Sequence, residues 1–303
     1  MMKYIEMGIL VYYRTTEPVH YLRSHSRNMV FRLAEGKIVC NLDADNYLGE
    51  GFAEFMLKEF QEKKKIFYTS NLCVRDVFGR VCLEKEAFMA VKGYNELLVG
   101  YGVEDADLFK RLTCIGHRRH VFIQESFYGA LTHEDNERVV EEPLLKKLYA
   151  LYLDYIDPYS TRILMLYKEH FWGMGALQNN VAMNCNLNNI ECDRIEQCMS
   201  DKYRFVVKEE WKEGEWCNVD GGILLNGKYL FVDNQKGLCY RDRYFYKVTD
   251  VDLIVTVVLL ITEALNYSKV KRTLDNNECI NSQGFGCGTV FRNFDYANRI
   301  ILK

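Results

Sequence analysis

The sequence lacks the cysteine spacing of a disulfide or zinc scaffold. Its 303 residues include 11 cysteines, an odd number, and none of them form a Cys-x-x-Cys pair. A disulfide framework needs paired cysteines and a zinc ribbon needs Cys-x-x-Cys pairs, so neither scaffold is indicated. We expect most cysteines to be small, buried apolar residues, and the expected location is a reducing cytoplasm.

Long apolar runs and an excess of positive charge are also missing. The runs at 8–13 and 253–261 are too short for a secretory signal core or a membrane span. The net charge is -3, and the Lys and Arg residues are scattered, which argues against a nucleic-acid surface. No membrane span is therefore expected, while the composition leaves peripheral membrane attachment and the oligomeric state open.

What the sequence does contain is a balance typical of a soluble globular protein, with 49% hydrophobic and 27% charged residues. The pattern changes near Asp157-Pro158, after which Asn-rich stretches and glycine turns such as Asn226-Gly227 become frequent. We predict two domains, residues 1–156 and 157–303.

The first half alternates between strand-like and helix-like segments, which is typical of an α/β fold. Strands are predicted at 8–13, 37–42, 65–73 and 120–123, and helices at 26–34, 50–63, 85–91, 104–114 and 143–155. The first strand, helix and second strand are expected to form a parallel unit with Asp43 at its carboxyl edge. The second half is predicted to be α+β, with short strands and an apolar run over 251–265 that forms a buried helix or, alternatively, a strand followed by a helix.

Two acidic motifs are the strongest functional signals. Asn41-Leu42-Asp43-Ala44-Asp45-Asn46 ends a strand with two aspartates that could bind one hard cation. Residues 100–112 place Glu104 and Asp105 after a glycine hinge, at the start of a helix. Together they suggest a metal site beside a general base. The alternatives are a solvated loop for the first motif and helix capping for the second, since the helix dipole favours acidic groups there.

These motifs resemble those of known glycosyltransferases. Ser26-Arg27-Asn28, the helix end Ala34-Glu35-Gly36 and residues 38–46 resemble the central signature of family-2-type enzymes with the GT-A fold. Residues 93–96 followed by 100–105 resemble the acceptor-side region of β-1,4-galactosyltransferases. The resemblance spans about residues 8–138. It implies a partial GT-A, Rossmann-like mixed sheet flanked by helices.

The resemblance also implies a role for each matching residue. A divalent cation, Mn²⁺ or Mg²⁺, would hold the diphosphate of a UDP-sugar donor, and Asp105 would be the general base on a glycan acceptor. The remaining roles are donor binding by Arg27, Asn28 and Asp43, metal binding by Asp43, Asp45 and His133, and acceptor binding by Glu104, Tyr101 and Gly102.

The sequence departs from the family pattern in two ways. Val103 stands in place of a small glycine and Ala106 in place of an acidic residue. Only 42 residues precede Asp43, enough for one strand–helix–strand unit. We therefore expect the N-terminal nucleotide-binding part of a GT-A fold to be missing.

The leading hypothesis is an inverting, metal-dependent glycosyltransferase that moves a hexose or N-acetylhexosamine, with UDP-galactose or UDP-N-acetylgalactosamine as the implied donor. The alternative is a truncated, non-catalytic transferase-like module that binds glycan or a partner protein. A glycoside hydrolase with two carboxylates would explain the acids, but not the order of the motifs.

Overall fold

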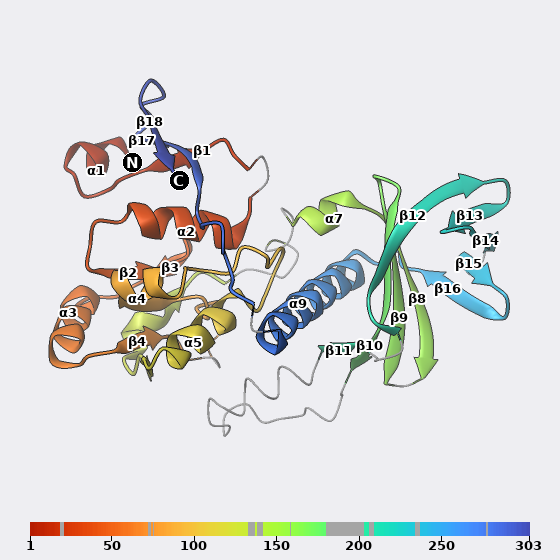
Figure 1. Cartoon of the computed structure of the whole chain (residues 1–303), viewed down its shortest axis with the longest axis horizontal. Coiled ribbons are helices and arrows are strands. Elements are labelled where there is room, and N and C mark those ends of the chain that lie inside the picture. The colour runs from red at the N-terminus through yellow and green to blue at the C-terminus, as the bar shows by residue number, and fades with distance from the viewer. Residues whose placement is uncertain are drawn as a thin grey trace. The chain divides into compact units, whose positions relative to one another are not determined.

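The computed structural model describes residues 1–18, 21–71, 74, 76–132, 137, 142–157, 159–179, 203–205, 209–233, 237–276 and 278–303. These residues divide into two compact units (Figure 1). The first unit comprises Met1–Val99, Val103–His133 and Lys269–Lys303, and the second comprises Gly100–Gly102 and Glu134–Ser268. This division differs from the boundary expected after residue 156, because contacts between distant segments, rather than a change of composition, define each unit.

A four-stranded mixed sheet forms the centre of the first unit. Its strands, in spatial order, are β2 (Ile38–Asn41), β5 (Val81–Glu84), β4 (Ile66–Thr69) and β6 (Arg118–Val121). The pairs β2–β5 and β5–β4 are antiparallel, and β4–β6 is parallel. Strand β5 was not predicted, although Val81-Cys82-Leu83 is a short apolar run, and β2 is antiparallel to it rather than part of a parallel unit.

The strand predicted at 8–13 does not form as expected. Residues 2–6 form α1 (Met2–Glu6), and the strand that follows, β1 (Tyr13–Thr15), is short and lies later in the sequence. β1 pairs with β17 (Gly288–Arg292), which pairs with β18 (Arg299–Leu302) in a separate three-stranded sheet. The predicted strand–helix–strand unit is therefore wrong, because the partner of β1 comes from the other end of the chain.

The helices of the first unit follow the apolar periodicity of the sequence. They are α2 (Arg23–Leu33), α3 (Phe52–Glu62), α4 (Lys85–Ala90) and α5 (Glu104–Cys114), each within three residues of its predicted bounds. A two-stranded pair, β3 (Asn46–Tyr47) with β7 (Gly129–Ala130), follows the Asp43–Asp45 motif, and a 3-10 turn η1 (Glu125–Tyr128) precedes β7.

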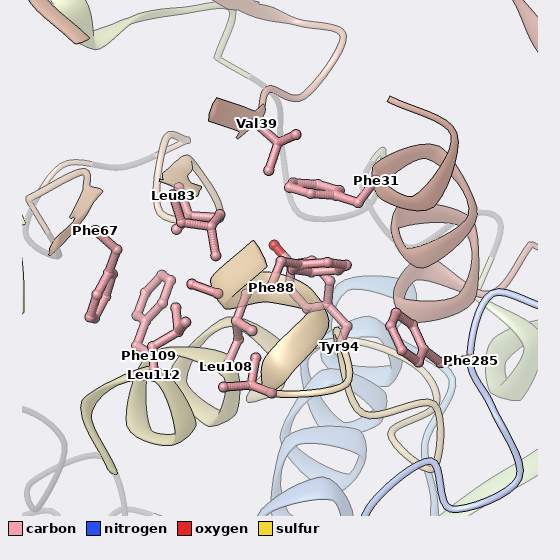
Figure 2. Packing of buried hydrophobic residues seen from close by; sticks show 13 residues of the cluster. Phe31, Val39, Phe67, Leu83, Phe88, Tyr94, Leu108, Phe109, Leu112 and Phe285 are labelled. Atoms are coloured by element: carbon pink, nitrogen blue, oxygen red, sulfur yellow. The ribbon is translucent and has the colours of Figure 1, made fainter. Parts of the chain in front are cut away.

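The central sheet has a core on each face. On one face, Phe31 of α2 stacks on Phe88 of α4 with ring centroids 4.5 Å apart, and α5 adds Leu108 and Leu112 (Figure 2). Phe285, from the C-terminal segment, packs into the same cluster. On the other face, α3 packs against residues of β4, Phe122 and Phe127. Burial on both faces explains why β4 is apolar almost throughout.

The second unit is a closed antiparallel sheet of eight strands. In order around the sheet they are β10 (Phe171–Asn179), β12 (Lys212–Val219), β13 (Gly222–Leu225), β14 (Lys228–Asp233), β15 (Gly237–Tyr240), β16 (Arg243–Lys247), β8 (Leu148–Asp157) and β9 (Ser160–Tyr167). Pairing between β9 and β10 closes it, and β11 (Tyr203–Phe205) adds to β10. The interior is filled by apolar side chains, among them Trp172, Trp216 and Leu230.

The predicted helix at 143–155 is wrong after its first turn. Only α7 (Pro143–Lys147) is helical, and β8 begins at Leu148. Ala150 and Tyr152 point into the closed sheet, whereas Leu151 and Leu153 pack outside it. Because β8 is buried on both faces, its apolar run has no clear period, and such a run resembles a buried helix segment.

Helix α9 (Val251–Asp275) packs on the outside of the closed sheet (Figure 1). Its residues Val257, Val258, Ile261 and Ala264 join β8, β9 and β10 in one apolar cluster. Among the described residues, α9 is the one helix whose length and composition would let it cross a membrane, a test that the core helix of a soluble protein also passes. The helix was predicted over 251–265 and continues ten residues further.

Candidate functional site

Arg27 joins the two acidic motifs in the first unit. Its Nη1 donates to Asp105 Oδ1 at 3.1 Å and its Nη2 donates to Asp43 Oδ1 at 3.3 Å. Arg27 lies on α2, Asp43 follows β2, and Asp105 is in the first turn of α5. The structure therefore brings together three residues that are distant in the sequence and that were predicted to belong to one site.

Burial sets the electrostatics of this cluster. The Asp105 side chain is 8% exposed, and burial raises its pKa to about 6, although Arg27 opposes the shift. Burial alone would lower the pKa of Arg27, but the negative charge of Asp105, Glu104 and Asp43 raises it above its usual value. Asp43 is 44% exposed at its side chain, so it is solvated whereas Asp105 is buried.

Glu104 belongs to the same cluster. Its Oε1 lies 3.6 Å from Arg27 Nη1 and 3.5 Å from Arg23 Nη1. In the described structure no side chain caps the start of α5, whose N-cap residue is Val103. The acidic pair at this helix start therefore engages arginines of α2, beyond any favourable interaction with the helix dipole.

Gly79 forms the floor of the cluster, and sequence reasoning missed it. A Cβ at this position would lie 3.1 Å from Arg27 Nη2, 3.2 Å from Asp105 Oδ2 and 3.5 Å from Asp43 Oδ2. Asn41 Nδ2 donates to the Gly79 carbonyl at 2.9 Å, which fixes the backbone there. The absence of a side chain thus leaves space at the point where the three charged groups meet.

Asn28, predicted to bind the donor, is completely buried. Its Nδ2 donates to the Tyr94 carbonyl at 2.9 Å and to Glu96 Oε1 at 2.8 Å, and its Oδ1 accepts from the Tyr94 amide at 2.7 Å. Within the described residues its amide therefore holds α2 against the segment before α5. Donor binding by Asn28 stays a prediction.

Glu96 lies in the 93–96 motif, but no role of its own was predicted for it from the sequence. It bonds to His25 Nδ1 at 3.0 Å, accepts from Asn28, and accepts from the Gly286 amide at 2.6 Å. Burial acts to raise its pKa, but these hydrogen bonds lower it overall. Glu96 thereby connects α2, which carries Arg27, to the C-terminal segment.

The aspartate loop turns tightly after β2. The Asn46 amide donates to the Asp43 carbonyl at 3.0 Å, and the Leu131 amide donates to the Asp45 carbonyl at 2.8 Å. His133, the third predicted metal ligand, lies outside the described residues. Among the described residues no group of three His, Cys, Asp or Glu side chains could hold a metal ion.

Two carboxylates still fit a nucleotide-bound cation. Mg²⁺ is usually held by one or two carboxylates together with substrate phosphates, rather than by an all-protein cage. Asp43 and Asp45 supply hard oxygen donors of this kind, and Asp43 is accessible to solvent. The donor chemistry of these two carboxylates is compatible with Mn²⁺ or Mg²⁺ at a diphosphate, and their role as metal ligands stays a prediction.

Tyr101 and Gly102, predicted to bind the acceptor, belong to the second unit. The Gly102 carbonyl accepts from Asn266 Nδ2 of α9 at 3.1 Å, and its φ of 93° is one that favours glycine. Their acceptor role stays a prediction.

Comparison with known proteins supports part of this assignment. Residues 71–133 match the family model described as the N-terminal domain of galactosyltransferase. This part of the chain is therefore galactosyltransferase-like, and it contains Gly79, Glu104 and Asp105, whereas Arg27 and Asp43 lie outside the matched range. No curated protein matches the chain. No solved structure matches it either.

Proposed function

We propose that the protein is an inverting, metal-dependent glycosyltransferase that moves a hexose or N-acetylhexosamine from a UDP-sugar to a glycan acceptor. The main support is the convergence of Asp43 and Asp105 on Arg27, since it joins the expected donor and acceptor motifs in one cluster. The galactosyltransferase-like match over residues 71–133 is consistent with it. The first unit would then be a partial GT-A fold, and the cytoplasm the location.

Asp105 is proposed as the general base. A hydroxyl must lose its proton as it attacks the anomeric carbon, and a positioned carboxylate can accept that proton. With a pKa near 6, Asp105 is ionised at neutral pH and is more basic than an ordinary aspartate. A single base that directs attack from the face opposite the leaving group gives inversion of configuration.

Asp43 and Asp45 are proposed to hold the donor side, with His133 as a further ligand. When bound, Mn²⁺ or Mg²⁺ would offset the negative charge that develops on the departing nucleoside diphosphate. Arg27, beside Asp43, adds a fixed positive charge at the junction of the donor and acceptor sides. Because Arg27 bonds to both carboxylates, it would hold the two motifs at a fixed separation.

The test of donor binding is a thermal shift with Mn²⁺ and UDP. At about a hundred times the dissociation constant, a ligand that binds only the folded state stabilises it by about 2.7 kcal/mol. Asp45→Ala should abolish the shift. A wild-type protein that shows no shift at millimolar Mn²⁺ and UDP would contradict a working donor site.

The test of chemistry is transfer of sugar from radiolabelled UDP-galactose or UDP-N-acetylgalactosamine to glycan acceptors. Asp105→Asn keeps the size of the side chain but removes its basicity, so turnover should fall about 100-fold or more. UDP and Mn²⁺ binding should stay near wild type. Asp107→Asn is the matched control, since Asp107 pairs with Arg111 on the same helix and should affect stability more than turnover.

A non-catalytic module that binds glycan or a partner protein is the second candidate. The observation that favours it is the same cluster, because Arg27 compensates both Asp43 and Asp105 without any substrate. Such a network can stabilise the fold without any catalytic role. Good UDP and Mn²⁺ binding by the wild type without detectable transfer would favour this module. Near-wild-type turnover in Asp105→Asn would instead remove Asp105 from the mechanism.

A further inference from the structure

The side-chain amide of Asn46 is held at both ends. Asn46 is the residue after Asp45, begins β3 and is 9% exposed. Its Nδ2 donates to Asp45 Oδ1 at 2.8 Å and to the Asp76 carbonyl at 3.1 Å, and its Oδ1 accepts from Arg80 Nη2 at 2.9 Å. One oxygen of Asp45 is thus tied to a neutral amide whose other end meets a cation.

Arg80 determines which way this amide faces. A guanidinium has only donors, so the atom of Asn46 that meets it must be the carbonyl oxygen. The NH₂ group then faces Asp45, where a carboxylate needs a donor. The flipped amide would place donor against donor at Arg80 and oxygen against oxygen at Asp45.

Arg80 is buried at a cost to stability. Its side chain is 1% exposed, and burial lowers its pKa. Nη2 also donates to the Gly129 carbonyl at 3.2 Å, whereas Nε and Nη1 have no hydrogen-bond partner among the described residues. A buried cation that is only partly satisfied is expensive. Packing therefore gives no reason for an arginine here, but orientation of Asn46 does.

We propose that Arg80 and Asn46 are positioning residues that fix the Asp45 carboxylate for the cation of the donor. This inference rests on the proposed function, in which Asp45 is a metal ligand. Side chains that hydrogen-bond to a metal ligand set its orientation, and their loss commonly costs 10–100-fold in metal affinity. The order of the relay is Arg80 to Asn46 to Asp45.

The hydrogen bond from Arg80 to the Gly129 carbonyl fixes the position of the guanidinium. Gly129 lies in β7, which pairs with β3 through Asn46↔Ala130 and Tyr47↔Gly129. Arg80 therefore holds both the strand that carries Asn46 and the strand beside it. Movement of the guanidinium would disturb the Asn46 amide, and with it Asp45.

The experiment measures Mn²⁺ affinity in the presence of UDP by calorimetry, together with the melting temperature, for the full chain. Asn46→Ala and Arg80→Met should each weaken Mn²⁺ binding by about tenfold or more. Arg80→Met removes a partly satisfied buried cation but leaves the Asn46 and Gly129 oxygens without their donor, so these opposing effects should leave its melting temperature nearly unchanged. The double variant should bind about as weakly as either single variant, because both changes interrupt one relay.

Two further variants separate positioning from general stability. Arg80→Lys keeps a cationic donor for Asn46 and should retain affinity closer to wild type than Arg80→Met does. Arg111→Met is the matched control, since it removes an arginine of the same unit that pairs with Asp107. It should lower the melting temperature and leave Mn²⁺ affinity unchanged.

The outcomes distinguish the two proposals. If the wild type binds Mn²⁺ and the affinities of Asn46→Ala and Arg80→Met lie within twofold of it, the positioning role is overturned and the proposed donor site is not. Affinity losses that follow the melting temperature in every variant, Arg111→Met included, would assign Arg80 a structural role only. Absence of Mn²⁺ binding by the wild type at millimolar ion would refute the proposed donor site, and the relay with it.

Discussion

At the scale of single residues, Asp105 and Asp43 are chemically different although both contact Arg27. Asp105 is almost completely buried and has a raised pKa, whereas Asp43 is half-exposed. Two carboxylates in different environments can take different roles, one as a base and the other as a ligand. This difference leads to a pH dependence that can be measured.

We expect kcat/KM for sugar transfer to fall as the pH drops through about 6, because protonated Asp105 cannot accept a proton. The measurement is a pH profile of kcat/KM at saturating Mn²⁺. In the same window the stability contribution of Asp105 runs the opposite way. Folding favours its protonated form, so this contribution is present below about pH 4 and is lost as the pH rises through the folded pKa.

The control for this profile is Asp105→Asn, whose residual activity should lack the acidic limb. Relative to wild type, its free energy of unfolding, measured by urea titration, should increase from about pH 4 to 7, because only the wild type loses the Asp105 contribution in this range. A wild-type profile that is flat down to pH 4.5 would contradict the assignment of Asp105 as the base.

A side chain at Gly79 should interfere with transfer. In Gly79→Ala the new methyl group would press on Arg27, Asp105 and Asp43 at 3.1–3.5 Å. These neighbours are side-chain ends that can shift, so the loss of unfolding free energy should be about 1 kcal/mol, the usual size for a point substitution. A small displacement of reacting groups is costly, so transfer should fall about tenfold or more. Unchanged transfer would show that the space at Gly79 is not part of the site.

Individual residues of the site were predictable where a motif carried them. Arg27, Asp43 and Asp105 came from recognisable patterns, and the structure places them together. Gly79 and Arg80 were not found, because a lone glycine or arginine has no local pattern, and their meaning comes from neighbours that are distant in the sequence.

At the scale of elements, the start of α5 carries local strain. Val103 precedes the helix with φ 77°, a left-handed conformation that is unfavourable for a β-branched residue. Glycine, the residue that the sequence resemblance would place here, adopts this conformation freely. Val103 therefore holds a backbone conformation that glycine tolerates better.

We predict that Val103→Gly stabilises the protein by about 1 kcal/mol, the relief of strain less the conformational entropy of glycine. Urea unfolding measures this change. Ala106→Gly, the same kind of change inside α5, is the control and should destabilise by about 0.5–1 kcal/mol. Destabilisation in both variants would mean that the strain at Val103 is compensated by its packing.

Elements were predictable where the apolar pattern had one period. Helices α2, α3 and α5 each bury one face, and their bounds follow from the sequence. The error at 143–155 arose because β8 buries both faces, which removes the alternation that identifies a strand.

At the scale of the whole molecule, the first unit is built from both ends of the chain. Residues 269–303 belong to it, β1 pairs with β17, and Arg32 Nη1 donates to the Phe285 and Gly286 carbonyls. Local pattern could not reveal this return, because pairing of distant segments depends on the complete fold. The glycine-rich stretch at 284–288 provides part of this connection, through the contacts of Phe285 and Gly286.

Two compact units with separate cores need not unfold as one. We therefore expect urea unfolding to show two transitions if the units differ in stability, since multidomain chains commonly depart from two-state behaviour. Phe285 is a probe of the first unit alone, because it is 8% exposed and packs in the core cluster of Figure 2.

Phe285→Ala should destabilise the first unit by about 3 kcal/mol, the usual scale for truncating a buried phenylalanine, and leave the transition of the second unit unchanged. Hydrogen exchange read by mass spectrometry can assign each transition, with peptides of α2 and α5 reporting on the first unit and peptides of β8 and β9 on the second. Phe294→Ala is the matched control. That ring is 39% exposed and stacks on Tyr12, so its loss should cost less than about 1.5 kcal/mol. Equal destabilisation by the two variants, or a Phe285→Ala effect confined to β8 and β9, would show that the C-terminal segment does not support the unit that carries Arg27.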